Sequence, residues 1–186
     1  CCFNQNHKIG INEFNIWMRI LKKIDKSVLW LINSNRWAKN NILKQFELNN
    51  INTSRIIFAN NLPHLEHLER HRHADIFLDT FNYNAHTTAS DALWGGLPII
   101  TKQGSQFAAR VASSLLSALD LNELITKTDD EYEKLIINYA SQPEKLKEIK
   151  EKLKRNKNDK PLFNTQQYTR HFELSMQKVY ELYLNG

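Results

Sequence analysis

Cysteine, glycine and long apolar runs are scarce or missing in this sequence, and each shortage excludes a class of protein. The two cysteines, Cys1 and Cys2, are adjacent, so their side chains point to opposite sides of an extended strand and are poorly placed to form a disulfide with each other. A reducing, cytoplasmic compartment is therefore expected. The sequence contains no apolar run of membrane-spanning length and no secretion signal, so a membrane is not an expected partner.

The glycine-rich phosphate motifs are also missing. No Gly-x-Gly-x-x-Gly follows the first apolar segment and no P-loop sequence occurs, which argues against a dinucleotide oxidoreductase and against a P-loop enzyme. The net charge of +5 is mild, the lysines are spread along the chain, and those at 145–160 are interleaved with acids, whereas a nucleic-acid-binding protein carries a basic stripe with aromatic residues. Nucleic acid is therefore not an expected partner.

The residues that are present predict one globular domain. The chain has 186 residues, of which 41% are hydrophobic and 24% charged, as in ordinary globular proteins. Apolar segments typical of buried strands alternate with helical patterns, which predicts a doubly wound, Rossmann-like α/β fold with a parallel sheet. The expected strands are 1–4, 28–32, 55–58, 76–80 and 98–101. The expected helices between them are 13–24, 38–48, 64–72, 87–95 and 106–119.

The pattern changes after residue 119. We expect 1–119 to form the parallel α/β core and 120–186 to form a helical C-terminal part, with helices over 129–141, 143–156 and 165–184. The last helix carries an apolar stripe made of Tyr168, Phe172, Met176, Val179, Tyr180 and Tyr183. Such a helix is expected to pack on its own domain, although it could also contact a partner domain. Because the sequence begins directly with a strand and without methionine, we expect a fragment of a longer polypeptide.

The stretch 76–96 contains the candidate ligand site. It reads as a strand, a polar loop, and a helix that opens with His86, Thr87 and Thr88. A helix N-terminus offers unpaired N–H groups and the positive end of the helix dipole to an anion, and these three side chains add donors suited to a phosphate or diphosphate. Asp91, one turn further on, can accept hydrogen bonds from a sugar diol. The alternative is that a threonine merely caps the helix and Asp91 is a solvated acid.

Motifs spread over nearly the whole chain carry a family resemblance. They are Cys2-Phe3-Asn4 with Lys8-Ile9, Ser27-Val28-Leu29-Trp30-Leu31, Arg55-Ile56-Ile57-Phe58, Ala74-Asp75, Leu78-Asp79-Thr80, His86-Thr87-Thr88, Leu93-Trp94, Arg110-Val111-Ala112 and Pro161-Leu162-Phe163-Asn164. On these residues the chain resembles the carboxyl-terminal half of the O-GlcNAc transferase and SPINDLY family of GT-B glycosyltransferases, and bacterial members in particular. The resemblance implies the C-terminal domain of a GT-B fold. It also implies the donor-binding half of an enzyme that transfers a sugar from a UDP-sugar, with UDP-GlcNAc expected, to Ser or Thr of protein acceptors.

The same resemblance implies roles for individual residues. Lys8 is implied to be the catalytic cation that stabilises the departing diphosphate, and Gln5 to face the same group. The other implied donor-binding residues are Leu62 and Arg70 at the base, His67 near the nucleotide sugar, His86, Thr87 and Thr88 at the phosphates, and Asp91 at the ribose. His64 stands where relatives of the animal enzyme carry a lysine, which weakens the contact that this position is implied to make with the nucleotide.

The resemblance also implies what this chain does not contain. The amino-terminal catalytic half of the family, which binds the protein acceptor, and the helical TPR repeats that often precede it are absent from the sequence. We therefore expect the chain alone to bind the donor without transferring it. No cofactor is required by a transferase of this family.

Three alternatives remain open at this stage. His67 and His71 have the i, i+4 spacing of two metal ligands, but no third ligand follows from spacing alone, so no metal site is expected. A SPINDLY-type member would use GDP-fucose, and His86 favours a UDP donor over that alternative. The aromatic terminal helix and the fragment-like start would also suit a non-catalytic docking module that binds no small ligand.

Overall fold

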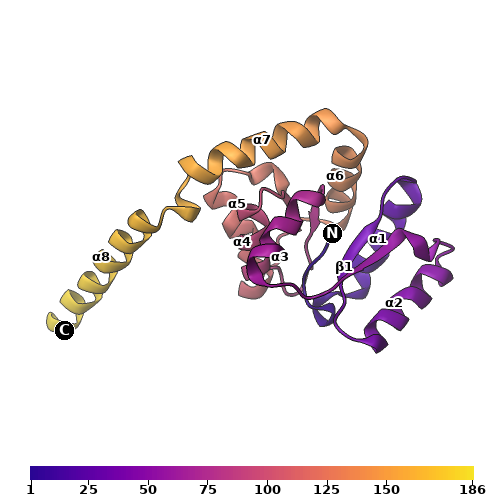
Figure 1. Ribbon diagram of the computed structural model, residues 1–186. Coiled ribbons are helices and arrows are strands. Elements are labelled where there is room, and N and C mark those ends of the chain that lie inside the picture. Colours follow the sequence, from indigo (N-terminus) through magenta and orange to yellow (C-terminus); the bar gives the residue numbers. More distant parts are fainter.

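The computed structural model describes residues 1–186 and shows an α/β body from which one long helix extends (Figure 1). All paired strands are parallel, as the sequence predicted. The strands are β1 (Leu29–Ile32), β2 (Ile56–Ala59), β3 (Phe77–Leu78), β4 (Ile99–Lys102) and β5 (Ile125–Thr126). β1 pairs with β2, and β3 and β5 flank β4. The short β5 lies beyond residue 119, so the parallel pairing continues past the range in which the sequence predicted the sheet.

The N-terminal segment connects these two groups of strands. Cys2 forms a parallel bridge with Leu31 of β1, and the N–H of Leu78 in β3 donates to the carbonyl of Cys1 at 2.7 Å. The N-terminal segment is thus the first strand in the chain, and the strands lie side by side in the order β2, β1, N-terminal segment, β3, β4, β5. When the six strands are numbered by their place in the chain, this order is 3-2-1-4-5-6, which is the order of the Rossmann fold. The order reverses between the first strand and β3, and ligands bind at such a switch point.

Helices occupy every segment in which the sequence predicted them, with small differences at the ends. They are α1 (Ile11–Lys23), α2 (Arg36–Leu48), α3 (His64–Arg70), α4 (Thr87–Trp94), α5 (Val111–Ala118), α6 (Asp129–Ser141), α7 (Pro143–Asp159) and α8 (Thr165–Leu184). α1 begins two residues earlier than predicted, with Gly10 as its cap, and the Glu13 carboxylate accepts from the N–H of Gly10 at 2.7 Å. The helix predicted from 106 starts instead as a 3-10 turn, Phe107–Ala109, before α5.

The core links the helical C-terminal part to the end of β3. The indole N–H of Trp17 in α1 donates to the hydroxyl of Tyr132 in α6 at 3.2 Å, and that hydroxyl donates to the carbonyl of Asp79 at 3.1 Å. Both aromatic side chains are almost fully buried. Buried aromatic side chains of this size dominate core energetics, so α6 supports the loop that follows β3.

The terminal helix α8 does not pack on its own domain, contrary to the expectation from its aromatic stripe. None of its residues is buried, and it extends away from the body (Figure 1). Just before α8, Phe163 forms an edge-to-face pair with Trp94 of the body, with ring centres 5.2 Å apart. The 3-10 turn Pro161–Phe163 and the cap Asn164, which accepts from the N–H of Gln167, redirect the chain before the helix starts.

We expect deletion of residues 165–186 to leave the melting temperature of the body within about 2 °C of the full chain, because α8 adds no buried surface to it. Differential scanning calorimetry of the two chains measures this. A fall of more than about 5 °C would show that α8 packs on the body in solution.

Candidate functional site

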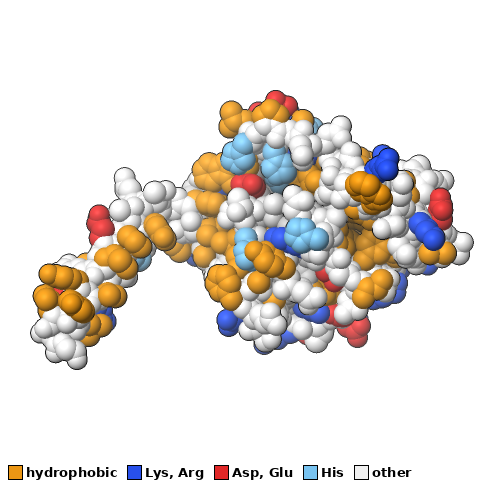
Figure 2. Space-filling model, turned by 90° about the horizontal axis from the view of Figure 1, so that it is seen from below, with side chains coloured by type: hydrophobic (Ala, Val, Ile, Leu, Met, Phe, Trp, Pro, Cys, Tyr) orange, Lys and Arg blue, Asp and Glu red, His pale blue; other side chains and the backbone are white.

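The candidate site is formed where the first strand and β3 end. Because parallel strands place their carboxyl ends on one edge, the loop after the first strand, the loop after β3 and the N-terminus of α4 meet there. Figure 2 views the molecule from this end. Histidine side chains gather near the middle of this face, with a small acidic patch beside some of them.

The buried carboxylate of Asp79 holds the loop between β3 and α4 by hydrogen bonds to its backbone. Its carboxylate is fully buried and accepts from the backbone N–H groups of Thr80 at 2.8 Å and Ala85 at 2.6 Å, and from the hydroxyl of Thr101 at 2.6 Å. Burial raises the pKa of Asp79 to about 7, although these hydrogen bonds favour the charged form and oppose the rise. The carboxylate therefore holds the two ends of the loop together.

Asn4 joins the first strand to this loop and to α4. Its amide group donates to the hydroxyl of Thr80 at 2.8 Å and lies 3.5 Å from the Asp79 carboxylate. Its amide oxygen accepts from the hydroxyl of Thr88 at 2.6 Å. The Thr88 hydroxyl was predicted to be free to donate to a phosphate, but in the structure its proton is already donated within the protein.

The N-terminus of α4 offers the unpaired donors that the sequence predicted. The carbonyl of His86 accepts from the N–H groups of Ala89 at 3.0 Å and Ser90 at 3.1 Å. The N–H groups of Thr87 and Thr88 have no partner within the chain, and the Thr87 side chain is exposed. Two N–H groups at a helix start are a suitable site for an anion.

Lys8 and His86 meet at the ring of Tyr83. The ammonium group of Lys8 lies 3.9 Å from the centre of the Tyr83 ring and donates to the carbonyl of Asn84 at 3.3 Å. The imidazole of His86 stacks on Tyr83 with ring centres 4.7 Å apart, and its Nε2 lies 3.3 Å from the carbonyl of Ala108. Partial burial lowers the pKa of Lys8. Lys8 therefore lies on the same face as the start of α4.

α3 runs beside this part of α4. The Nε2 atom of His64 lies 3.5 Å from the Asp91 carboxylate, and the His64 side chain is largely exposed. His67 packs its ring against Phe3, with ring centres 5.6 Å apart. Burial lowers the pKa of His67, and the nearby Arg70 adds to the effect.

Arg70 lies deeper than the resemblance implied. It is buried, and its guanidinium donates to the carbonyl of Asn60 at 2.9 Å. Asn60 begins the loop that carries the exposed Leu62, so Arg70 holds this loop from behind. His71 is also buried, which lowers the pKa of its imidazole to about 4. The structure has no group of three or more His, Cys, Asp or Glu side chains placed to hold a metal ion.

The ten predicted site residues fall into two groups. One group surrounds the start of α4: Lys8, His64, His86, Thr87, Thr88 and Asp91. The other lies further out: Gln5, whose side chain lies 3.5 Å from the Ser34 hydroxyl after β1, and Leu62, His67 and Arg70 at α3 and the loop before it. Asn4 and Asp79 stood in the motifs of the family resemblance, but no role in the site was predicted for them; the available signal was that each follows an apolar run.

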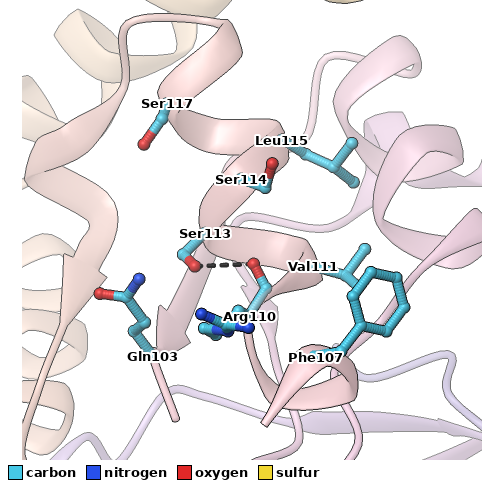
Figure 3. A pocket seen from close by; sticks show the side chains of 8 residues that line it. All are labelled: Gln103, Phe107, Arg110, Val111, Ser113, Ser114, Leu115 and Ser117. Atoms are coloured by element: carbon cyan, nitrogen blue, oxygen red, sulfur yellow. Dashed lines mark hydrogen bonds between the residues drawn. The ribbon is translucent and has the colours of Figure 1, made fainter. Parts of the chain in front are cut away.

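One cavity lies next to this site and not in it. A hollow of about 490 Å³ is lined by side chains from the end of β4, the Phe107–Ala109 turn and α5. Figure 3 shows Ser113 donating to the carbonyl of Arg110, with Gln103 on one side and Phe107 on the other. The Phe107 ring meets the edge of His86 at 6.2 Å between ring centres. Phe107 therefore lines this cavity and also contacts His86 at the start of α4.

A parallel sheet of Rossmann order with a free helix N-terminus at its switch point is an arrangement typical of nucleotide-binding domains. Comparison with protein families makes the identification specific. The model of glycosyl transferase family 41 matches residues 1–172, and the chain belongs to this family.

Individual relatives agree with this assignment. The chain is 33% identical over 186 residues to a Caenorhabditis elegans UDP-N-acetylglucosamine–peptide N-acetylglucosaminyltransferase, covering 100% of the chain and 16% of the relative. It is 30% identical over 190 residues to a Hordeum vulgare protein described as the probable transferase SPINDLY, covering 99% and 20%. The chain thus spans about a fifth or less of the length of these relatives.

A solved structure confirms the predicted fold. A mutant of the Thermobaculum terrenum O-GlcNAc transferase superposes with a TM-score of 0.86 at 26% identity, over 96% of this chain and 34% of the solved chain. The expected fold class, a Rossmann-like domain of the GT-B type that ends in a long helix, is therefore confirmed. None of the helices is long and apolar enough to cross a membrane.

Proposed function

We propose that this chain is the donor-binding domain of a protein O-glycosyltransferase, which uses a UDP-sugar, with UDP-GlcNAc as the expected donor, to modify Ser or Thr of protein acceptors. The observation that carries the proposal is the free N-terminus of α4 beside Lys8. Membership of glycosyl transferase family 41 and the activity named for the Caenorhabditis elegans relative support it.

The chemistry of the proposed reaction explains the cation at this place. Cleavage of the bond between sugar and diphosphate leaves negative charge on the departing diphosphate, and donors already aimed at that charge lower the barrier. The unpaired N–H groups of Thr87 and Thr88 are fixed by the helix, and Lys8 adds a full positive charge. Lys8 contacts the Tyr83 ring and the Asn84 carbonyl, and a diphosphate at the α4 N-terminus would compete for these contacts. No cofactor takes part in this scheme.

The remaining contacts follow the arrangement of α3 and α4. Asp91 accepts from the ribose hydroxyls, and His64 beside it contacts the nucleotide more weakly than a lysine would. His67 lies at the nucleotide sugar. The loop with Leu62, supported by Arg70, borders the base, and Gln5 reaches the diphosphate from the loop after the first strand.

We further propose how this domain belongs to a larger protein. Residues 1–186 act as one cytoplasmic nucleotide-sugar-binding domain, and the acceptor is bound by an amino-terminal half and TPR repeats elsewhere in the full-length enzyme. The chain alone then binds the donor without transferring its sugar. The exposed aromatic stripe of α8 fits this view, and it equally favours the second candidate, a docking module without a small ligand.

A thermal-shift titration tests the proposal. UDP binds only the folded chain, so it should stabilise it by about 2.7 kcal/mol at a hundredfold excess over the dissociation constant. GDP serves as the matched nucleotide. A larger shift with GDP would favour the SPINDLY-type, GDP-fucose-using alternative. No shift at millimolar concentrations of either nucleotide would favour the docking module.

A further inference from the structure

A chain of hydrogen bonds beneath the candidate site has a fixed direction. The hydroxyl of Thr80 donates its only proton to the carbonyl of Tyr83 at 2.6 Å. It can therefore only accept from Asn4, whose amide group lies 2.8 Å away. The neighbouring Asp79 carboxylate is an acceptor as well. The amide N–H₂ of Asn4 must face these two acceptors, and this orientation is set by the network around it.

The orientation of Asn4 in turn determines what Thr88 can do. With its N–H₂ group turned inward, Asn4 presents its oxygen to Thr88, and the 2.6 Å contact requires the Thr88 hydroxyl to be the donor. Thr88 then has only lone pairs left for a ligand. Asn4 is 1% exposed, and losing a partner would leave a buried polar group unsatisfied.

We propose that Asn4 is a positioning residue of the donor site, which fixes the first turn of α4 against the first strand by taking the proton of Thr88. This inference rests on the proposed function. Asn4 lies four residues before Lys8, and Thr88 lies next to Thr87, so the bond ties the loop that carries the cation to the helix end that carries the free N–H groups. Phosphate recognition then falls to those N–H groups, Thr87 and Lys8, while the Thr88 oxygen accepts from a hydroxyl of the donor.

Binding of two related ligands tests the positioning role. UDP and uridine share the base and ribose, but only UDP has phosphates. We expect Asn4→Ala to weaken UDP binding about fivefold and uridine binding less than about twofold, measured by NMR titration. Asn156→Ala is the matched control, because Asn156 is also a buried asparagine with one strong bond, to the Leu119 carbonyl at 2.7 Å, and is remote from the site. Equal losses for UDP and uridine in Asn4→Ala would overturn the proposal.

The UDP affinity of a double variant provides a second test, because two independent structural roles would predict that the losses of the single variants multiply. Asn4→Ala and Thr88→Val remove the same hydrogen bond, so the double variant should bind UDP as weakly as the weaker single variant. Thr88→Ser, which keeps the hydroxyl, should bind UDP within about twofold of the unchanged chain. Multiplying losses in the double variant would show that the two residues act separately, and the proposal would fail.

Hydrogen exchange distinguishes a failure of this inference from a failure of the proposed function. In the ligand-free chain, Asn4→Ala should speed amide exchange in the first turns of α4 at least fivefold, and Asn156→Ala should not. Absence of UDP binding by the unchanged chain would refute the proposed function, and the exchange result would still decide whether Asn4 holds α4. Unchanged amide exchange in the first turns of α4 in Asn4→Ala would refute the proposal that Asn4 fixes this part of the helix.

Discussion

Replacing Lys8 with alanine should weaken UDP binding roughly ten- to hundredfold, whereas Thr88→Ala should weaken it only about two- to tenfold. Deleting a charged hydrogen bond costs about 1.5–3 kcal/mol, and deleting a neutral one about 0.5–1.5 kcal/mol. The structure adds a second reason, because the Thr88 proton is already donated to Asn4 and the helix N–H groups remain when the threonine side chain is removed.

Salt provides the control for this comparison. The attraction between the lysine and a diphosphate is screened over about 10 Å at 0.1 M salt and about 3 Å at 1 M salt. The difference in UDP affinity between Lys8→Ala and Thr88→Ala should therefore become smaller when the calorimetric titrations are repeated at high salt. Equal losses at both salt concentrations would mean that the helix terminus dominates phosphate recognition, and the role of Lys8 would have to be withdrawn.

The stability of the folded chain should depend on pH through Asp79. Its pKa is about 7 in the folded chain, against an ordinary value of 3.8, so the folded state holds this proton more tightly than the unfolded state. The stabilisation by neutral Asp79 is then complete below about pH 4 and is lost as the pH rises through about 7. The difference of roughly 3 pKa units corresponds to about 4 kcal/mol.

Asp79→Asn isolates this contribution, because the amide does not titrate and the Thr101 hydroxyl can reverse its hydrogen bond to accept from it. Urea unfolding of both chains between pH 4 and pH 8 measures the effect. The free energy of unfolding of the unchanged chain, relative to that of the variant, should fall by about 4 kcal/mol over this range. Parallel pH profiles would show that the Asp79 carboxylate is charged throughout.

The pattern of the sequence predicted most of the fold. Apolar runs such as 28–32 and 98–101 are followed by helical periodicity, and this alternation determines parallel strands and crossover helices. Only the short β5 was not predicted, because two residues are too few to show a period. The residue range of α8 was predicted correctly, but its packing on the body was not. An apolar stripe indicates that a helix has a partner without indicating where that partner lies.

The candidate site was predictable only where its residues are close together in the sequence. The start of α4 follows from the order of residue types along the chain, and Lys8 followed only from the family resemblance. The contacts of Asn4 with Thr80 and Thr88 join residues 76 and 84 positions apart, and no spacing rule relates them. The burial of Arg70 was missed for a similar reason, since its partner is the backbone carbonyl of Asn60 in a loop.

Titration of the isotope-labelled chain with UDP, followed residue by residue by NMR, tests the central claim most directly. Saturable shifts of backbone signals should concentrate in two segments, 5–9 after the first strand and 86–91 at the start of α4. Lys8→Ala should raise the dissociation constant without moving the binding site. Shifts confined to the cavity beside α5 or to α8, or no shifts at millimolar UDP, would contradict the assignment of a donor site at this edge of the sheet.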